Sequence, residues 1–341
     1  MNTDANIDEI DPDASFTTID THTEGEPTRI ILDGVDTSTL SGDSVREKRD
    51  AFADTHDWVR ELLMKEPRGH DDMFGAVLVE PKHDAADVGV FFMDSQGYLD
   101  MCGHGTIGVV SALLELGQLS PQPSIQVETP AGVVEARPQY TETGVDTITI
   151  QNVQSFVYDE VAVTVSFRET PLNVDVVYAG NYFALVDSDQ LDVPVDTTHT
   201  DDFIEWGLEI RDAVNDELDV AHPPTGEPGE VSITEIYSSS ADVDRSIVVF
   251  GDGQVDRSPC GTGTCAKMTL LHDTGQLGVD EPYLHESIVG TQFEGRLAAT
   301  EERDGLTVTT PLITGSARIT GQHTFVKDPK DSITGFSLSS H

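Results

Sequence analysis

The chain carries an internal repeat: two Gly-rich segments coincide when the sequence is aligned with itself at an offset of 158 residues. The pentapeptide CGHGT at Cys102 falls on CGTGT at Cys260, and the tripeptide GQL follows at the same distance after each cysteine. Each copy predicts a strand, a tight turn and then a helix that begins at the cysteine and ends at a glycine. The expected architecture is therefore two similar domains, each with such a helix at its centre.

The remaining sequence pattern is that of an α+β protein. Apolar residues at helical spacing predict helices over 44–64 and 201–215. Short apolar segments bounded by turn residues predict strands, and they do not alternate regularly with helices as in a βαβ fold. The predicted strands are two within 16–32 and then 74–79, 88–93, 125–128, 146–151, 161–167, 174–178, 182–187, 231–237 and 246–250.

The charge of the chain limits its partners. Among 341 residues, 62 are Asp or Glu and 19 are Lys or Arg, which gives a formal net charge of −43. Nucleic acid and anionic membrane surfaces carry the same sign, so neither is an expected partner. The acidic residues are scattered among apolar segments, which favours a folded protein with a carboxylate-rich surface. Such a surface is tolerated best where concentrated salt screens it, so the sequence predicts a protein from a halophile.

No sequence feature predicts export, membrane insertion or a disulfide framework. Residues 1–15 are acidic, lack an apolar region and are expected to form a disordered tail. No apolar segment approaches the roughly 18 residues that a transmembrane helix needs. Three cysteines in a chain of this length are too few for a disulfide scaffold. We therefore expect a cytoplasmic protein.

A cysteine at the start of a helix is well placed for chemistry. The first N–H groups of a helix lack partners, so they can bind a carboxylate, and the helix dipole favours a thiolate over a thiol. Two related helix starts that face one ligand could hold its Cα between Cys102 and Cys260. One sulfur would remove the Cα proton while the other donates a proton to the opposite face, which inverts the centre by general acid–base catalysis.

Other interpretations of the cysteines were weighed. A free cysteine is most often a small core residue, which suits Cys265 within the second predicted helix. A metal site formed by Cys102, His104, Cys260 and Cys265 is disfavoured, because no C-x-x-C pair is present. A redox disulfide between Cys102 and Cys260 is feasible but lacks the usual spacing.

Several blocks of the sequence resemble the signature segments of the proline racemase family. The resemblance runs in order from about residue 16 to the C-terminus. It implies a fold like that of proline racemase and diaminopimelate epimerase, with two pseudo-symmetric domains, each a β-rich roll around a central helix, and an active site in the cleft between them. It also implies a homodimer that uses neither a cofactor nor a metal. The blocks are EPRGHDDMFGA (66–76), MCGHGTIG (101–108), GQVDRSPCGTGT (253–264) and ESIVGTQFEG (286–295), with THTEGEPTRI (21–30) and ITGSARITG (313–321) as further matches.

With the repeat, this resemblance gives expected domain bounds. The N-terminal domain is predicted to span 16–155, to contain Cys102 and to be completed by 316–341. The C-terminal domain is predicted to span 156–315 and to contain Cys260.

The resemblance also assigns roles to individual residues. Cys102 and Cys260 match the two catalytic thiols, and Asp256 matches the residue that receives the ammonium group of the substrate. A buried cationic ring nitrogen needs such an anion. The positions that match substrate-binding residues beside the thiols are Gly103, His104, Gly261 and Thr262.

The same comparison orders the possible reactions. Phe74 and Phe250 match the aromatic walls of proline racemase pockets, where the hydroxyl of a hydroxyproline would lack a partner. Cofactor-independent racemisation of proline is therefore favoured, and 4-hydroxyproline 2-epimerase is the alternative. The related trans-3-hydroxyproline dehydratases replace the second thiol with a hydroxyl, which disfavours that activity because Cys260 is present. A non-catalytic amino-acid-binding protein is the remaining class.

Overall fold

The computed structural model describes residues 14–222, 226–240 and 243–338. The predicted tail, 1–15, lies outside these residues except for Ala14 and Ser15, which begin strand β1. The helices predicted over 44–64 and 201–215 are present, and both cysteine-led helices form. The α-helices of the described residues are α1 (Val45–Met64), α2 (Gly103–Glu115), α3 (Thr200–Glu217) and α4 (Gly261–Asp273). No helix in the described part of the chain is both long enough and apolar enough to cross a lipid bilayer.

The first set of strands runs in the order β20, β1, β2, β3, β4, β6, β7, β8. Neighbours are antiparallel except for the pairs β2–β3 and β4–β6, which are parallel. The short strand β5 (Tyr98–Leu99) adds to β4. The bounds are β1 (Ala14–Thr23), β2 (Glu26–Asp33), β3 (Gly75–Val79), β4 (Val88–Met93), β6 (Ile125–Thr129), β7 (Gly132–Thr141), β8 (Gly144–Gln151) and β20 (Ala317–Lys327).

The second set repeats this arrangement in the order β9, β10, β11, β14, β15, β17, β18, β19. Again two pairs are parallel, β11–β14 and β15–β17, and they occupy the same places in the order. A short strand, β16 (Gln254–Val255), adds to β15 as β5 does to β4. The bounds are β9 (Phe156–Val163), β10 (Leu172–Tyr178), β11 (Tyr182–Asp187), β14 (Val231–Ser238), β15 (Asp244–Phe250), β17 (Tyr283–Ser287), β18 (Gln292–Arg303) and β19 (Leu306–Gly315).

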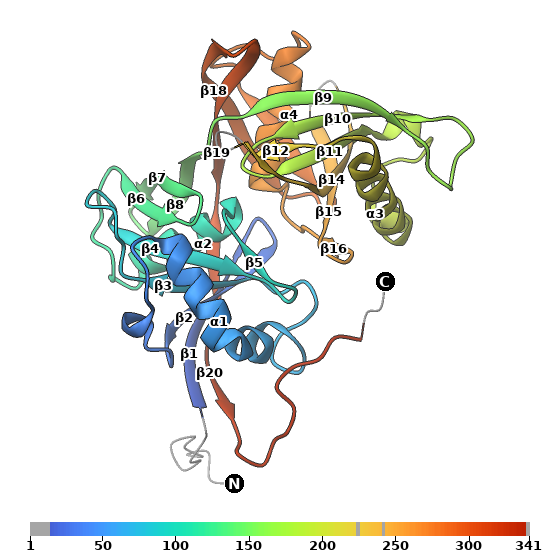
Figure 1. Cartoon of the computed structure of the whole chain (residues 1–341). Helices are drawn as coiled ribbons and strands as arrows, with labels where there is room; N and C mark the ends of the chain where they lie inside the picture. The colour runs from blue at the N-terminus through green and yellow to red at the C-terminus, as the bar shows by residue number, and fades with distance from the viewer. Residues whose placement is uncertain (1–13, 223–225, 241–242, 339–341) are drawn as a thin grey trace.

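The matching pairings confirm the α+β fold with two pseudo-symmetric halves that the sequence repeat predicts. The halves are joined where β8 pairs with β19. The chain passes from β19 through Ser316 alone into β20, which returns to the first set (Figure 1). A separate hairpin is formed by β12 (Ala221–His222) and β13 (Glu227–Pro228). The domain bounds given above remain a prediction.

Helices α2 and α4 are the buried centres of the two halves. Helix α2 packs against β1, β2, β8 and β20, and α4 packs against β9, β10, β18 and β19. Both are thirteen residues long and are followed by a glycine with positive φ, Gly117 (67°) and Gly275 (74°), as the repeated GQL motif predicts. An apolar core that surrounds both helices continues from one half into the other.

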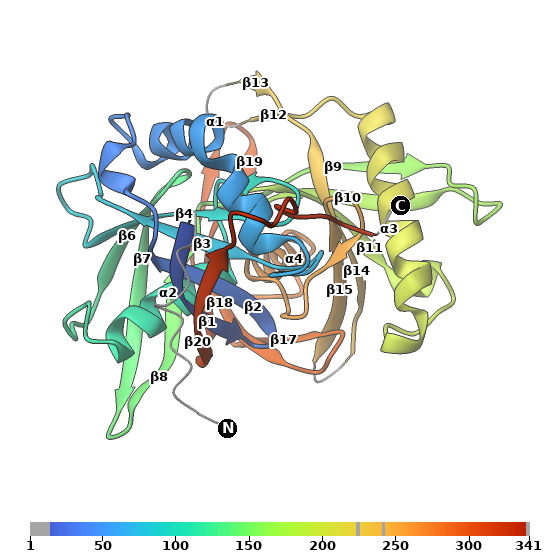
Figure 2. The same ribbon diagram turned by 90° about the horizontal axis from the view of Figure 1, so that it is seen from below.

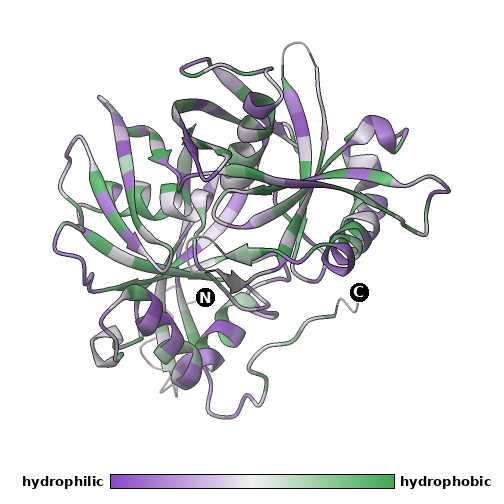
Figure 3. Ribbon diagram, turned by 45° about the horizontal axis from the view of Figure 1, so that its top comes forward, coloured by the Kyte–Doolittle hydropathy of each residue, from purple (hydrophilic) through white to green (hydrophobic). Residues whose placement is uncertain are grey.

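Helices α1 and α3 cover the outer faces of the two sets. Helix α1 packs on β3 and β4, and α3 packs on β14 and β15, each over its own apolar cluster. Figure 2 shows α3 at the outer side of the second set and α4 within it. Some strands show alternating hydrophobic and hydrophilic bands in Figure 3, because successive side chains point to opposite faces, whereas β4 and β11 are buried along nearly their whole length.

Candidate active site

The N-termini of α2 and α4 meet at Gly103 and Gly261. A Cβ atom built on Gly103 would lie 3.2 Å from the Cα of Gly261, and the reciprocal distance is 3.1 Å. The side chain of Ile313, in β19, fills the remaining space against both glycines. A side chain at either position would be in tighter contact with the facing backbone than is usual, so the close approach favours glycine on both sides.

This contact brings Cys102 and Cys260, the preceding residues, to the same place. Each cysteine is the N-cap of its helix, and its Sγ accepts a hydrogen bond from the third residue: Gly105 N at 3.3 Å and Gly263 N at 3.4 Å. The two residues are 5% and 8% exposed. The predicted pair of cysteine-led helix starts is therefore formed and enclosed.

The residues two positions after the cysteines also match. His104 lies beside Cys102, with its Nδ1 3.4 Å from Sγ, and Thr262 lies beside Cys260, with Oγ1 3.6 Å from Sγ. Burial lowers the pKa of His104 to about 3, so its ring is neutral and polar rather than cationic. Neither neighbour therefore supplies a positive charge to its thiol.

The sequence argument that a helix start lowers the thiol pKa is corrected by the structure. Burial raises the pKa of both thiols above the ordinary value, and the hydrogen bonds from Gly105 and Gly263 only partly oppose it. Nearby carboxyl groups act in the same direction as burial, chiefly Asp256 for both thiols. In the free protein both cysteines are therefore favoured as thiols rather than thiolates.

Asp256 is buried and is tied directly to the start of α4. Its Oδ1 accepts hydrogen bonds from the backbone N (2.8 Å) and the Oγ (2.7 Å) of Ser258, and Ser258 Oγ in turn accepts from Cys260 N at 3.1 Å. Burial raises the pKa of Asp256 to about 6, although its hydrogen bonds with Ser258 and the Cys260 thiol oppose this shift. The carboxyl predicted to receive an ammonium group is therefore fixed beside one thiol.

The sequence analysis assigned no role to Glu26, which is a second buried carboxyl at this site. It is fully buried at the start of β2, and its Oε2 accepts a hydrogen bond from Arg257 N at 2.6 Å. Its Oε1 has no hydrogen-bond partner within the described residues. Burial and then the charge of Asp256 raise the pKa of Glu26. Glu26 lies within the block THTEGEPTRI, which was the available sequence signal. The block could not show that Glu26 contacts Arg257, because the two residues are far apart in the chain.

Phe74 and Phe250 come together from the two halves. Phe74 directly precedes β3 and Phe250 ends β15, and their ring centroids are 5.6 Å apart. Phe74 also contacts the edge of the His104 ring, with centroids 4.7 Å apart. The two predicted pocket residues thus form one aromatic surface beside the site.

Polar contacts close the seam between the halves. Arg257 forms an ion pair with Asp72 at 2.8 Å, and Gln254 Nε2 donates to the carbonyl of Asp71 at 2.8 Å. Thr291 Oγ1 donates to the carbonyl of Glu24 at 2.6 Å. A surface cavity of about 290 Å³ opens along this seam, lined in part by Asp72 and Arg257.

Cys265 lies apart from this constellation. It is fully buried within α4, as the core interpretation predicts. All three cysteines are free thiols. Among residues 14–222, 226–240 and 243–338, no three His, Cys, Asp or Glu side chains are grouped so that they could hold a metal ion.

Two solved structures with the same architecture are an epimerase and a probable racemase. A hydroxyproline epimerase from Agrobacterium vitis, solved with bound trans-4-hydroxy-L-proline, superposes with a TM-score of 0.86, is 29% identical, and the match covers 95% of this chain and 96% of that one. A probable proline racemase from Agrobacterium radiobacter superposes equally well, at 28% identity over 95% of this chain and 96% of that one. The class defined by the fold is therefore that of the amino-acid racemases and epimerases.

The chain belongs to the proline racemase family. The family profile described as proline racemase matches residues 18–337. A proline racemase of Acetoanaerobium sticklandii is 40% identical over 328 residues, which cover 94% of this chain and 97% of the relative. A 4-hydroxyproline 2-epimerase of Streptosporangium roseum is 39% identical over 332 residues, 95% of this chain and 98% of the relative.

Proposed function

We propose that this chain interconverts L- and D-proline, with Cys102 and Cys260 as acid and base on opposite faces of the substrate Cα. The observation that supports this most strongly is the contact between Gly103 and Gly261, which sets two equivalent cysteine-led helix starts against each other. In one direction a thiolate removes the Cα proton while the other thiol donates its proton to the opposite face. The roles exchange in the reverse direction.

The other groups of the site suit a small amino acid. Within the described residues, the N–H groups of the first two residues of each helix have no acceptor, so the Gly103–His104 and Gly261–Thr262 pairs can bind its carboxylate. Asp256 would receive the ammonium group, and Phe74 and Phe250 would enclose the ring. Because both cysteines are almost fully buried, substrate can reach them only after the surrounding structure opens, and the Arg257–Asp72 ion pair lies on the seam between the halves.

Exchange at Cα tests the activity directly. Incubation of L-proline in D2O is expected to give D-proline with deuterium at Cα, measured by mass spectrometry and polarimetry. An amino-acid-binding protein without catalysis would exchange nothing, and that outcome would reject the proposal.

The pH dependence is expected to be bell-shaped, because a pair of thiols and a pair of thiolates are both inactive. Burial and Asp256 raise both thiol pKa values in the free protein, so the acidic limb of kcat/KM lies at high pH. A bound ammonium group offsets Asp256 and lowers the thiol pKa values, so the acidic limb of kcat should lie at lower pH than that of kcat/KM. Initial rates across pH at low and saturating proline measure both limbs. Coincident limbs would contradict this electrostatic account.

Epimerisation of 4-hydroxyproline at C2 is the second candidate, and the Agrobacterium vitis epimerase with bound trans-4-hydroxy-L-proline supports it. The paired rings of Phe74 and Phe250 favour proline, because a buried hydroxyl without a partner costs about 1–3 kcal/mol. We expect kcat/KM for proline to exceed that for 4-hydroxyproline by about tenfold or more. Phe250→Ser should narrow this ratio, with Phe156→Ser, outside the site, as the control. Turnover of hydroxyproline alone would overturn the assignment.

A further inference from the structure

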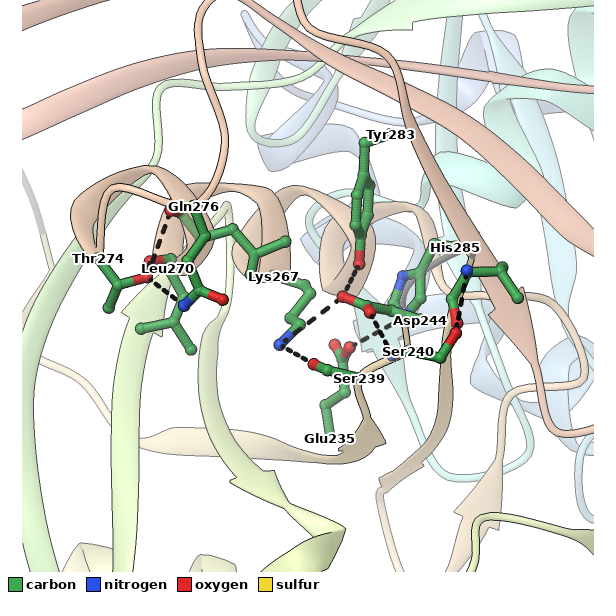
Figure 4. Close-up of polar contacts among 12 residues, drawn as sticks. Glu235, Ser239, Ser240, Asp244, Lys267, Leu270, Thr274, Gln276, Tyr283 and His285 are labelled. Carbon is green, nitrogen blue, oxygen red and sulfur yellow. Dashed lines mark hydrogen bonds and ion pairs between the residues drawn. The ribbon is translucent and has the colours of Figure 1, made fainter.

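A second group of buried polar residues lies behind Cys260, on the side of α4 away from α2. Glu235 in β14 and His285 in β17 are both fully buried, and Glu235 Oε1 lies 3.4 Å from His285 Nε2 (Figure 4). Lys267 in α4 lies 3.9 Å from Asp244, which also accepts a hydrogen bond from the Tyr283 hydroxyl at 3.0 Å. Nothing in the two-thiol scheme uses these residues.

Glu235 and His285 reach Cys260 by two routes. His285 Nδ1 lies 3.0 Å from Thr264 Oγ1, and that hydroxyl donates to the carbonyl of Cys260 at 2.8 Å. The second route passes through Gly263. A Cβ atom built there would lie 2.5 Å from Glu235 Oε2 and 3.3 Å from Cys260 Sγ, so the carboxyl oxygen and the sulfur are separated by at most the sum of these lengths.

The backbone of Cys260 needs such support. Its φ is +59°, a region that residues other than glycine seldom adopt, whereas Cys102 has φ −145°. Strain of this kind persists only where the surrounding structure fixes the residue. Thr264 donates to the Cys260 carbonyl at 2.8 Å, as Thr106 does to that of Cys102, but His285 lies behind the Thr264 hydroxyl.

One arrangement of protons satisfies the hydrogen-bonding groups behind Cys260. When the Thr264 hydroxyl donates to the carbonyl of Cys260 or Pro259, it accepts from His285 Nδ1–H, and His285 Nε2 carries no proton. Nε2 and both Glu235 oxygens have no hydrogen-bond partner within the described residues. A proton on Glu235 Oε1 would be donated to Nε2 and would give both atoms a partner. Burial raises the pKa of Glu235 to about 8, which agrees with a protonated carboxyl at neutral pH.

Among the described residues, the first half of the molecule has no counterpart of the Glu235–His285 pair. The place that Glu235 occupies beside Gly263 is taken beside Gly105 by the ring of Phe92, which lies 2.7 Å from a Cβ built there. The helix position that matches Lys267 is Val109, and β6 presents Ile125 and Val127 to the core around α2. The two thiols therefore differ in what lies behind them, although their own helix starts are alike.

We propose that Glu235, protonated and hydrogen-bonded to His285, is a positioning residue for Cys260, and that loss of its proton disfavours the Cys260 thiolate while Cys102 is unaffected. A carboxylate this close to the sulfur opposes a second negative charge there. The effect of Glu235 on catalysis rests on the proposed acid–base role of the thiols. Its effect on the charge of Cys260 does not depend on that role. The other titratable groups that face Glu235 are Lys267 and Cys265 on α4, Asp244 on β15, His285 and Tyr283 on β17, Tyr237 on β14, and Asp256 in the loop before α4.

The test is the rate at which iodoacetamide labels each cysteine, followed by mass spectrometry of the peptides across pH. An opening of the seam that exposes both cysteines raises both labelling rates, so its effect is removed when the rate for Cys260 is divided by the rate for Cys102 in the same sample. In the unmodified protein this ratio should fall as pH rises through about 8, the pKa of Glu235. Glu235→Gln keeps a donor to His285 and cannot ionise, so its ratio should match that of the unmodified protein at about pH 6.5 and exceed it about tenfold at about pH 9.5.

Asp175→Asn is the matched control, because it removes a carboxylate that faces Lys267 from β10 without touching Gly263. Its ratio should follow that of the unmodified protein at every pH. A constant ratio in the unmodified protein, or a Glu235→Gln ratio equal to it at high pH, would overturn the proposal. Labelling requires no turnover, so an inactive protein with the expected ratio would reject the proposed racemisation and leave the role of Glu235 standing.

Discussion

Replacement of Cys102 or Cys260 by serine is expected to lower proline racemisation by about 10³-fold or more. Each thiol acts as the acid or the base on one face of Cα. A serine hydroxyl is a much weaker acid than a thiol, so near neutral pH it replaces the thiol poorly in either role. Both variants should fold, because serine can still accept the hydrogen bond from Gly105 or Gly263 that caps each helix. Polarimetry with L- and D-proline measures the loss, and circular dichroism checks the fold.

Cys265→Ser is the control for this substitution. Cys265 lies in the same helix as Cys260 but is buried in the core of α4, away from the start of the helix. The Cys265→Ser variant should turn over proline at a rate within a few-fold of that of the unmodified protein. Near-normal turnover by either Cys102→Ser or Cys260→Ser would be incompatible with a scheme that needs two thiols.

The second large effect is expected from Gly103→Ala and Gly261→Ala. The new methyl group at 261 would lie 2.7 Å from Ile313 Cδ1 and 3.1 Å from the Cα of Gly103, so the Ile313 side chain must shift and the two helix starts must move apart by a few tenths of an ångström. A displacement of about 1 Å between catalytic groups can cost about 10²-fold in rate. Alanine is a better helix former than glycine, so the loss cannot be ascribed to a weaker helix. We expect kcat to fall while the secondary structure measured by circular dichroism is retained.

Gly97→Ala is the matched control for the glycine variants. It adds the same methyl group in the first half, at a position where no atom within the described residues lies within 4 Å of the new Cβ. Turnover should be unchanged. Equal activity in Gly97→Ala and Gly261→Ala would show that close approach of the helices is not required.

The sequence was most informative where function and local structure coincide. The offset between Cys102 and Cys260 predicts two halves, two helices and their glycine caps, because each of these depends on residues close together in the chain. The aromatic pair Phe74 and Phe250 was also identified, and the structure brings the two rings together. Their roles toward substrate remain predictions.

Properties that depend on distant contacts were not predictable. The helix-start argument identified a contribution that lowers the thiol pKa, but it could not weigh burial or Asp256, which raise that pKa, against one hydrogen bond. Glu26 and Glu235 gave no local signal among 62 acidic residues, since their importance comes from what surrounds them in the fold. Homodimerisation, a cytoplasmic location and adaptation to concentrated salt rest on resemblance and composition alone and remain predictions.

The return of β20 to the first set has a consequence for biosynthesis. The edge of an unpaired strand exposes N–H and C=O groups that can pair with another chain. In the folded protein β20 pairs with β1 along ten residues of β1. The ribosome makes β20 only after the whole second half has been translated. The first half therefore emerges early but waits for the end of translation to be completed, and during that interval the edge of β1 is open to pairing with other nascent chains.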